Sequence, residues 1–341
     1  MSSNVRRLEL TRAQVLAFRR RVGALDERLP AGARSLRRAA WAGLQDSMPR
    51  AAVLSIHARV AGAKAATWEH PSLVQIWGPR YSVFVVAARD RALFTLGRLP
   101  DDAAGRRRAE DASEKLQSLL GEERMGYGAA GRALGVHHNS LRYGTTTGTI
   151  ALRWDGARQP TIWNVPRPDM DPQAARLELA RRYLHIYGPG TALGFAKWAG
   201  LAARSAITAF AVLDRSLTPV RTPIGDASML LQDEETVREK RRPAAPARLL
   251  PSGDAFYLLH GAQRVLVLPD AKQRNALWTS RVWPGALLVD GEIVGIWRRT
   301  QHEVTVETWA KLSRNAREAV EAEASSLPLP DLARGVVVRW C

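Results

Sequence analysis

The chain has 341 residues, of which 46% are hydrophobic and 24% are charged, a composition typical of folded proteins of two or three compact units. Fifty Lys and Arg against 33 Asp and Glu give a formal net charge of +17, which favours a polyanionic partner, either nucleic acid or an anionic membrane surface. No apolar run approaches the roughly 20 residues of a membrane span, and the N-terminus lacks a signal-peptide pattern. A cytoplasmic protein without a membrane partner is therefore predicted.

Metal and disulfide chemistry have little support in the sequence. Cys341 is the single cysteine, so it cannot form an intramolecular disulfide, and no thiol cluster exists for zinc or iron–sulfur binding. Among the seven histidines, the close pair is His137 and His138, and adjacent side chains point in different directions. We therefore expect no metal and no cofactor.

The N-terminal part is predicted to contain three helices and a hairpin. Thr11 opens a capping-box pattern that starts the first helix. A second helix is expected over 35–44, and a third from Ser47, which would act as its N-cap before Pro in the first turn. The β-like runs 73–77 and 81–86 follow and are joined by a tight turn. Three helices followed by a hairpin is the order of elements in a winged helix.

The same order of elements occurs twice more. In the second unit, helical stretches are expected over 109–120 and 127–134, and Asp155-Gly156 between alternating apolar residues is a strong hairpin signal. In the third unit, Asp171 is predicted to cap a helix that stops at 188–190 and is followed by a second helix. The helix, tight turn and helix are typical of a helix-turn-helix.

A basic stretch rich in Pro and Ala, from 238 to 246, is predicted to be a linker or an exposed loop. Beyond it, hairpin and strand patterns precede a charged helix over about 313–327. We therefore predict an α+β fold of three tandem winged-helix modules followed by a small β-rich C-terminal part. The expected domains are 1–100, 101–168, 169–237 and 238–341.

Basic residues concentrate in the first unit, because residues 1–60 hold twelve Arg and four acidic residues. These arginines can contact phosphates, or they can form an ordinary solvated helix face. An Arg at a hairpin turn can enter a minor groove or simply keep the turn soluble. A donor-rich stretch of the second unit is suited to DNA backbone contacts, or to capping and turn chemistry. The predicted DNA contacts are Arg19, Arg20, Arg37, Arg38, Arg50, Arg80, His138, Asn139, Arg142, Thr145 and Arg158.

Four motifs follow one another along the chain: Gly43–Arg50 with His57–Val60, Tyr187–Thr191 with Phe195–Trp198, Leu249–Pro251 with Asp254, and Leu288–Gly291 with Val294–Arg298. In this order they resemble the winged-helix DNA glycosylases that repair interstrand crosslinks, the azinomycin-resistance type. The resemblance spans about residues 8–330. It implies three tandem winged helices, a concave basic DNA channel, a small β-rich addition and no metal.

The catalytic motif of that family is Gln, one intervening residue, then Gln or Asp. Gln45 matches the first position, but Ser47 stands at the third. The resemblance implies excision of N7-alkylated purines, whose positively charged base departs as a neutral molecule. Such a reaction needs a positioned water and a polar environment for an oxocarbenium-like sugar. Gln45 and Ser47 can hold a water, and Asp46 can act as a general base or stabilise the cation.

The same three residues also have a structural interpretation. Ser47 is an ordinary helix N-cap, Asp46 is favoured by the helix dipole, and Gln45 can simply end the preceding helix. Two hypotheses follow. The first is a monofunctional DNA glycosylase, a hydrolase of N-glycosidic bonds that acts as a monomer on alkylated or crosslinked double-stranded DNA. The alternative is a non-catalytic winged-helix DNA-binding protein, either a lesion binder or a transcriptional regulator.

Overall fold

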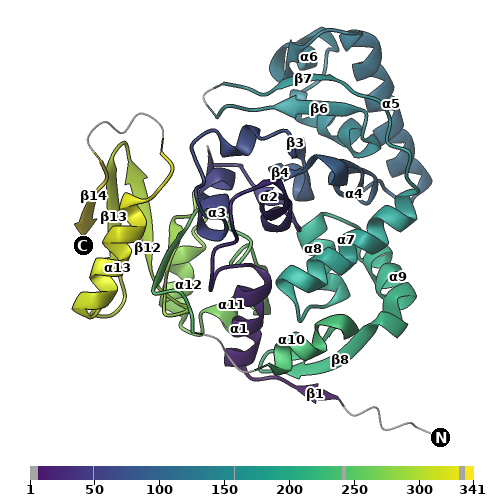
Figure 1. Cartoon of the computed structure of the whole chain (residues 1–341). Helices are drawn as coiled ribbons and strands as arrows, with labels where there is room; N and C mark the ends of the chain where they lie inside the picture. The colour runs from purple at the N-terminus through teal and green to yellow at the C-terminus, as the bar shows by residue number, and fades with distance from the viewer. Residues whose placement is uncertain (1–6, 49, 157, 240–242, 330–334) are drawn as a thin grey trace, which may run out of the picture.

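The computed structural model describes residues 7–48, 50–156, 158–239, 243–329 and 335–341. Helices alternate with four small sheets in this part of the chain (Figure 1). The second unit lies at the top of the view, the third at the lower right, and the C-terminal sheet with its covering helix at the left. The first unit lies between them, so its surface is bordered by all the other parts.

The first unit contains three helices around a three-stranded sheet of order β2-β4-β3, followed by a short fourth helix. Its elements are α1 (Arg12–Val22), α2 (Ala33–Ala39), β2 (Leu44–Gln45), α3 (Ala51–Arg59), β3 (Leu73–Trp77), β4 (Val83–Ala87) and α4 (Arg91–Leu96). Thr11 and Gln14 form the predicted capping box at the start of α1.

Two predicted helix boundaries in this unit are wrong. The second helix ends at Ala39, and Leu44 instead pairs with Val85 as part of strand β2. The third helix begins at Ala51 because the preceding residue, Arg50, has a left-handed backbone with φ 67°. Ser47 therefore is not the N-cap of α3.

The second unit repeats this order with a sheet of order β5-β7-β6. Its elements are α5 (Ala103–Leu120), β5 (Met125–Gly126), α6 (Tyr127–Ala133), a 3-10 helix over His138–Thr147, β6 (Ile150–Arg153) and β7 (Thr161–Asn164). The hairpin predicted around Asp155-Gly156 is confirmed, because β6 and β7 pair antiparallel on either side of it.

The third unit includes three helices, a hairpin and a short closing helix. Its elements are α7 (Pro172–Tyr187), α8 (Ala192–Ala199), α9 (Ala203–Leu213), β8 (Leu217–Thr222), β9 (Gly225–Leu230) and α10 (Glu234–Arg238). Asp171 caps α7 as predicted. Strand β1 (Leu8–Glu9), from the N-terminal part of the chain, joins this sheet parallel to β8. The N-terminal strand therefore ties the first unit to the third.

The C-terminal part is built on a five-stranded sheet of order β10-β11-β12-β13-β14. Its elements are β10 (Ala247–Leu250), α11 (Ala262–Val267), α12 (Ala271–Leu277), β11 (Gly285–Val289), β12 (Glu292–Thr300), β13 (Glu303–Thr308), α13 (Arg314–Ser325) and β14 (Val337–Trp340). The predicted hairpin through Asp290-Gly291 is confirmed by the pairing of β11 with β12.

One large hydrophobic core joins three of these parts. Phe84 of the first unit, Tyr183 and Trp198 of the third, and Tyr257 of the C-terminal part belong to the same buried cluster. Burial of aromatic side chains on this scale is a major source of stability. The first unit, the third unit and the C-terminal part are therefore held in fixed positions relative to one another.

Candidate functional site

Gln45 and Ser47 lie on the same side of the chain where strand β2 ends. Alternate residues of an extended strand face the same side, and the Gln45 Nε2 donates a hydrogen bond of 3.0 Å to the Ser47 Oγ. The Gln45 Oε1 is buried and has no hydrogen-bond partner. It lies against Gly253, where a Cβ would come within 2.8 Å of that oxygen. The predicted pair is thus brought together, and Gly253 leaves room for it.

Asp46 points the other way, into the protein, where it is 1% exposed. Its Oδ1 accepts a hydrogen bond from the Ala52 backbone N–H at 3.0 Å, and its Oδ2 accepts one from the Gln75 Nε2 at 2.9 Å. Burial raises the pKa of Asp46 to about 6, although these hydrogen bonds and the Arg50 charge act in the opposite direction. The structure therefore does not place Asp46 beside Gln45 and Ser47 as a general base. Its carboxylate satisfies an N–H in the first turn of α3, the role predicted for Ser47.

Gln75 connects this interior carboxylate to the second unit. Its Nε2 also donates to the Trp154 carbonyl at 3.1 Å, and its Oε1 accepts from the Trp154 N–H at 2.7 Å. Gln75 is buried within strand β3, between apolar neighbours. Sequence reasoning missed this residue, and the available signal was an amide side chain inside an otherwise apolar strand. Through Gln75, the position of β6 is coupled to the start of α3.

A cleft of about 750 Å³ opens next to the Gln45–Ser47 pair. Met48 follows the pair directly, and Ser252 precedes Gly253, so two of its walls are continuous with the pair. The lining residues include Met48, Arg50, Trp68, Ser252, Trp283, Arg298 and Arg299. The walls are thus apolar and aromatic. They also carry Arg50, the residue before α3, and Arg298 and Arg299 of β12.

Two guanidinium groups cover the aromatic ring of Trp68. The Arg50 Cζ lies 4.2 Å from the ring centroid, and the Arg153 Cζ lies 4.9 Å from it. Trp68 itself is 6% exposed. These cation–π contacts leave little of the ring free to stack on a base. Arg50 also lines the cleft, whereas Arg153 forms an ion pair of 2.9 Å with Glu69.

A buried ion pair fixes the segment that contains Gly253. Both Asp254 carboxylate oxygens accept hydrogen bonds of 2.7 Å from the Arg59 guanidinium, and the Ser55 hydroxyl donates to the same group at 2.7 Å. Arg59 and Ser55 belong to α3. Asp254 of the Leu-Leu-Pro…Asp motif therefore anchors this segment to the helix that follows the Gln45–Ser47 pair.

Two of the arginines predicted to contact DNA are buried in the protein. Arg19 is 2% exposed and donates from Nη2 and Nε to the carbonyls of Tyr187 and Gly188 at 2.7 and 3.0 Å. Arg20 is 8% exposed and forms an ion pair of 2.8 Å with Asp26. These two predictions are wrong, because both side chains cross-link α1 to other elements and leave no donor surface for a phosphate.

The prediction for Thr145 also fails on burial, and the prediction that Arg80 lies at an exposed wing tip is wrong in its placement of the side chain. Thr145 is 1% exposed and its hydroxyl donates to the Arg142 carbonyl at 2.7 Å. Arg80 does not project from an exposed wing tip, because its Nη1 donates to the His260 Nε2 at 2.8 Å and its Nε is buried. Arg142 is half-buried and donates to the Tyr127 hydroxyl at 3.0 Å.

The other predicted DNA contacts are more accessible. Three of them are exposed, namely Arg38, Asn139 and Arg158, and three are half-buried, namely Arg37, Arg50 and His138. The exposed groups come from α2, from the 3-10 helix of the second unit and from the β6–β7 hairpin.

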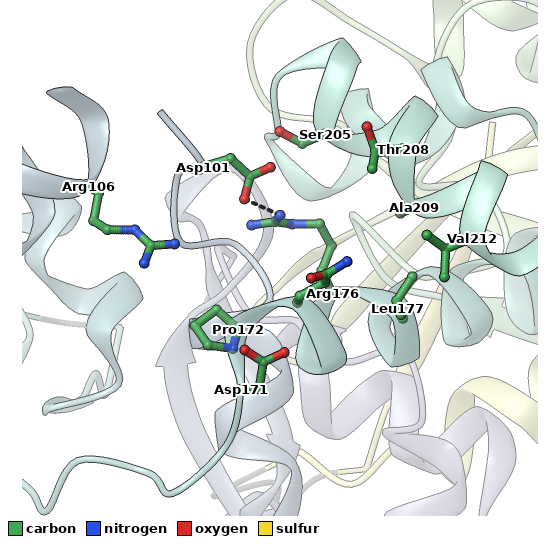
Figure 2. Close-up of a pocket in the computed structure, with 11 residues that line it drawn as sticks. Asp101, Arg106, Asp171, Pro172, Arg176, Leu177, Ser205, Thr208, Ala209 and Val212 are labelled. Carbon is green, nitrogen blue, oxygen red and sulfur yellow. Dashed lines mark hydrogen bonds and ion pairs between the residues drawn. The ribbon is translucent and has the colours of Figure 1, made fainter. Parts of the chain in front are cut away.

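A separate cavity of about 330 Å³ lies between the start of α5 and helices α7 and α9 (Figure 2). Arg176 points into it and pairs with Asp101, while its other nitrogens donate to the carbonyls of Gly97 and Leu99. Because its donors are occupied, this cavity is a less suitable binding site than the cleft beside Gln45. Within the described residues, no group of three His, Cys, Asp or Glu could hold a metal ion, and no helix is long and apolar enough to cross a membrane.

Comparison with known families identifies the chain. The model of the AlkZ-like DNA glycosylases matches residues 36–328. The chain belongs to the AlkZ-like DNA glycosylase family. The resemblance predicted from the four motifs is thereby confirmed, and the matched range contains Gln45, Gln75 and the residues that line the cleft, except Leu329.

A curated protein sequence and a solved structure, both from Streptomyces sahachiroi, are similar to this AlkZ-like chain. One, described as an interstrand DNA cross-link repair glycosylase, is 27% identical over 223 residues, which are 63% of this chain and 57% of that protein. The match therefore spans little more than half the length of that relative. The other is the solved structure of the DNA glycosylase AlkZ, with a TM-score of 0.77, 18% identity, and coverage of 98% of this chain and 100% of that one. At this identity, the structural match shows a common fold.

Proposed function

We propose that this AlkZ-like protein is a monofunctional DNA glycosylase that excises N7-alkylpurines and unhooks interstrand crosslinks in duplex DNA. The observation that carries the proposal is the hydrogen-bonded Gln45–Ser47 pair, which is followed directly by Met48 in the wall of a cleft with an arginine rim. Membership of the AlkZ-like DNA glycosylase family supports a DNA glycosylase activity.

The chemistry requires little acid catalysis from the protein. An N7-alkylpurine carries a positive charge, so when the bond between sugar C1′ and N9 breaks, its electron pair neutralises the base. A water oxygen then bonds to C1′ and gives one proton to solvent. The carboxamide of Gln45 and the hydroxyl of Ser47 are polar groups that orient this water, and polar groups fixed in advance stabilise the developing sugar cation.

Asp46 acts in this proposal as a positioning residue. Its carboxylate holds the start of α3 through Ala52 and the second unit through Gln75. Gln45 is the last residue of strand β2, and Ser47 lies in the connection from β2 to this helix. Asp46 therefore fixes the position of the Gln45–Ser47 pair from the interior side of the chain and does not contact the sugar.

We further propose that the three helix-and-hairpin units are winged-helix modules, with boundaries at 1–100, 101–168 and 169–237, and that the protein binds duplex DNA as a monomer. Their order of three helices and an antiparallel hairpin supports this assignment. Phosphate contacts are proposed for the accessible subset of the predicted residues, namely Arg37, Arg38, Arg50, His138, Asn139 and Arg158.

A non-catalytic DNA-binding protein is the second candidate. Ser47 favours it, because the catalytic motif of the family has Gln or Asp at that position. A serine side chain is shorter than either and carries no charge, so it reaches less far into the cleft.

The deciding experiment measures release of N7-methylguanine from duplex DNA, and unhooking of a nitrogen-mustard crosslink, with enzyme in excess. We expect wild-type protein to release the base, Gln45→Ala to lose most of the rate while still binding duplex, and the exposed-site control Gln232→Ala to match wild type. Tight duplex binding by wild-type protein without base release would establish the non-catalytic candidate instead.

A further inference from the structure

The turn between β3 and β4 lies at the same end of its sheet as the Gln45–Ser47 pair. Gln45 pairs with Phe84 of β4, and the Asp46 N–H donates to the carbonyl of Val83, the first residue of that strand. Arg80 stands in the turn immediately before Val83. The two features are therefore separated by a few residues of sheet, at about 3.4 Å per residue.

Three cations from different parts of the fold meet around this turn. Arg80 donates to the His260 Nε2 at 2.8 Å, and the Arg264 guanidinium lies 5.2 Å from the ring centroid of Trp283. The pKa of His260 is lowered to about 4, mainly because the imidazole is buried and further because of the positive charges of Arg80, Arg264 and Lys197. The imidazole between them is therefore neutral at pH 7, and its Nε2 is the acceptor.

No carboxylate of the described residues forms an ion pair with these three cations. Within the described ranges, Arg80, Lys197 and Arg264 form no ion pair, and the buried Arg80 Nε has no hydrogen-bond partner. Arg59 and Arg182, by contrast, each pair with a buried aspartate at 2.7 Å. Unpaired guanidinium groups in a partly desolvated position favour an anionic ligand.

The backbone holds Arg80 in a strained conformation. Arg80 and Tyr81 have φ values of 54° and 56°, in the left-handed region that is costly for residues other than glycine. Helix α8 ends at Ala199, and a Cβ at the following residue, Gly200, would come within 3.2 Å of the Arg80 backbone. The turn is thus packed against α8, and strained residues of this kind are often found at binding sites.

We propose that Arg80, Lys197 and Arg264 bind one phosphate group of the DNA backbone beside the Gln45–Ser47 pair. This inference rests on the proposed DNA substrate. One segment links the two sites, because Gly253 contacts Gln45 and His260 contacts Arg80. Trp283 both lines the cleft and lies under Arg264. A phosphate held here would fix the position of a nucleotide relative to the cleft without reading its sequence.

The first test is the salt dependence of duplex binding by full-length protein. Lys197 is exposed, so Lys197→Gln is expected to fold normally, and Lys311→Gln on the exposed loop before α13 is its matched control. We expect Lys197→Gln to reduce the slope of log Kd against log salt by about 0.9, the value for one phosphate contact, and Lys311→Gln to leave it unchanged. Equal slopes for Lys197→Gln and wild type would overturn the phosphate site.

The second test follows the His260 imidazole by NMR, assigned with His260→Gln, in free protein and with undamaged duplex. We expect the pKa of His260 to rise on DNA binding, because a phosphate offsets the charges of Arg80, Lys197 and Arg264. An unchanged pKa in a protein that binds duplex would refute the phosphate site while leaving the proposed function intact. Absence of salt-dependent duplex binding by wild-type protein would instead refute the DNA substrate itself.

Discussion

The carboxamide oxygen of Gln45 lies directly against the backbone of Gly253, so that a Cβ at position 253 would come within 2.8 Å of it. Gly253 also has φ +75°, in the left-handed region. The two residues are 208 positions apart in sequence, and their contact fixes one side of the candidate catalytic amide. It connects the first unit to the C-terminal part at the place where chemistry is proposed.

This contact predicts a selective effect of Gly253→Ala. The added methyl group would displace the Gln45 amide, and we expect base excision to slow by about tenfold to a hundredfold, since small misplacements of catalytic groups are costly. Gly121→Ala is the control, because Gly121 has φ +50° with no atom within 4 Å of an added Cβ. Both variants should lose about 1 kcal/mol of stability, and single-turnover excision should separate them. Equal excision rates in the two variants would contradict the role of this contact.

Ser47 is predicted to act through its hydrogen bond to Gln45. Ser47→Ala removes the acceptor for the Gln45 Nε2, and we expect excision to fall by about fivefold, as for loss of a hydrogen bond of about 1 kcal/mol. Ser47→Asp keeps an acceptor and should retain at least the wild-type rate. Single-turnover release of N7-methylguanine measures both effects. A Ser47→Ala variant as fast as wild type would show that the serine hydroxyl does not orient the amide.

Asp46 predicts a specific pH dependence of stability. Its pKa is raised from 3.8 in the unfolded chain to about 6 in the folded one, because burial disfavours the charged form. The resulting stabilisation is fully present below about pH 4 and is lost as the pH rises through about 6. Asp46→Asn lacks this titration, so wild-type protein should lose about 3 kcal/mol relative to the variant between pH 4 and 7. Urea unfolding of both proteins across this range measures the difference, and parallel stability curves would disprove the shift.

The ion pair between Arg59 and Asp254 predicts a large loss of stability. Asp254→Ala would leave the 3% exposed Arg59 side chain charged and unpaired, which costs about 3–5 kcal/mol. Arg314→Ala breaks the exposed Arg314–Glu318 pair instead, and we expect a change within about 0.5 kcal/mol. Chemical denaturation compares the two. A loss below about 1 kcal/mol for Asp254→Ala would mean that this pair does not anchor the segment.

Much of the local structure could be predicted from the sequence. Asp171 and Asp155-Gly156 gave correct positions for a helix start and a hairpin, because the hydrogen bonds that define caps and turns join residues three or four positions apart. The order of four short motifs was sufficient for the family. The short strand β2 was missed, because its partner β4 lies about 40 residues further along the chain and contributes the pairing.

The tertiary structure decided whether each charged side chain is buried and which groups it contacts. Arg19 lies in an arginine-rich stretch and reads as a phosphate contact, yet it donates to Gly188, 169 positions away. Asp46 reads as a catalytic carboxylate, yet it turns inward to Ala52 and Gln75. The sequence by itself determined most of the elements, their order and the family. Burial and charge pairing depend on contacts between distant segments, so only the folded chain decided which polar groups face the cleft and which hold it in place.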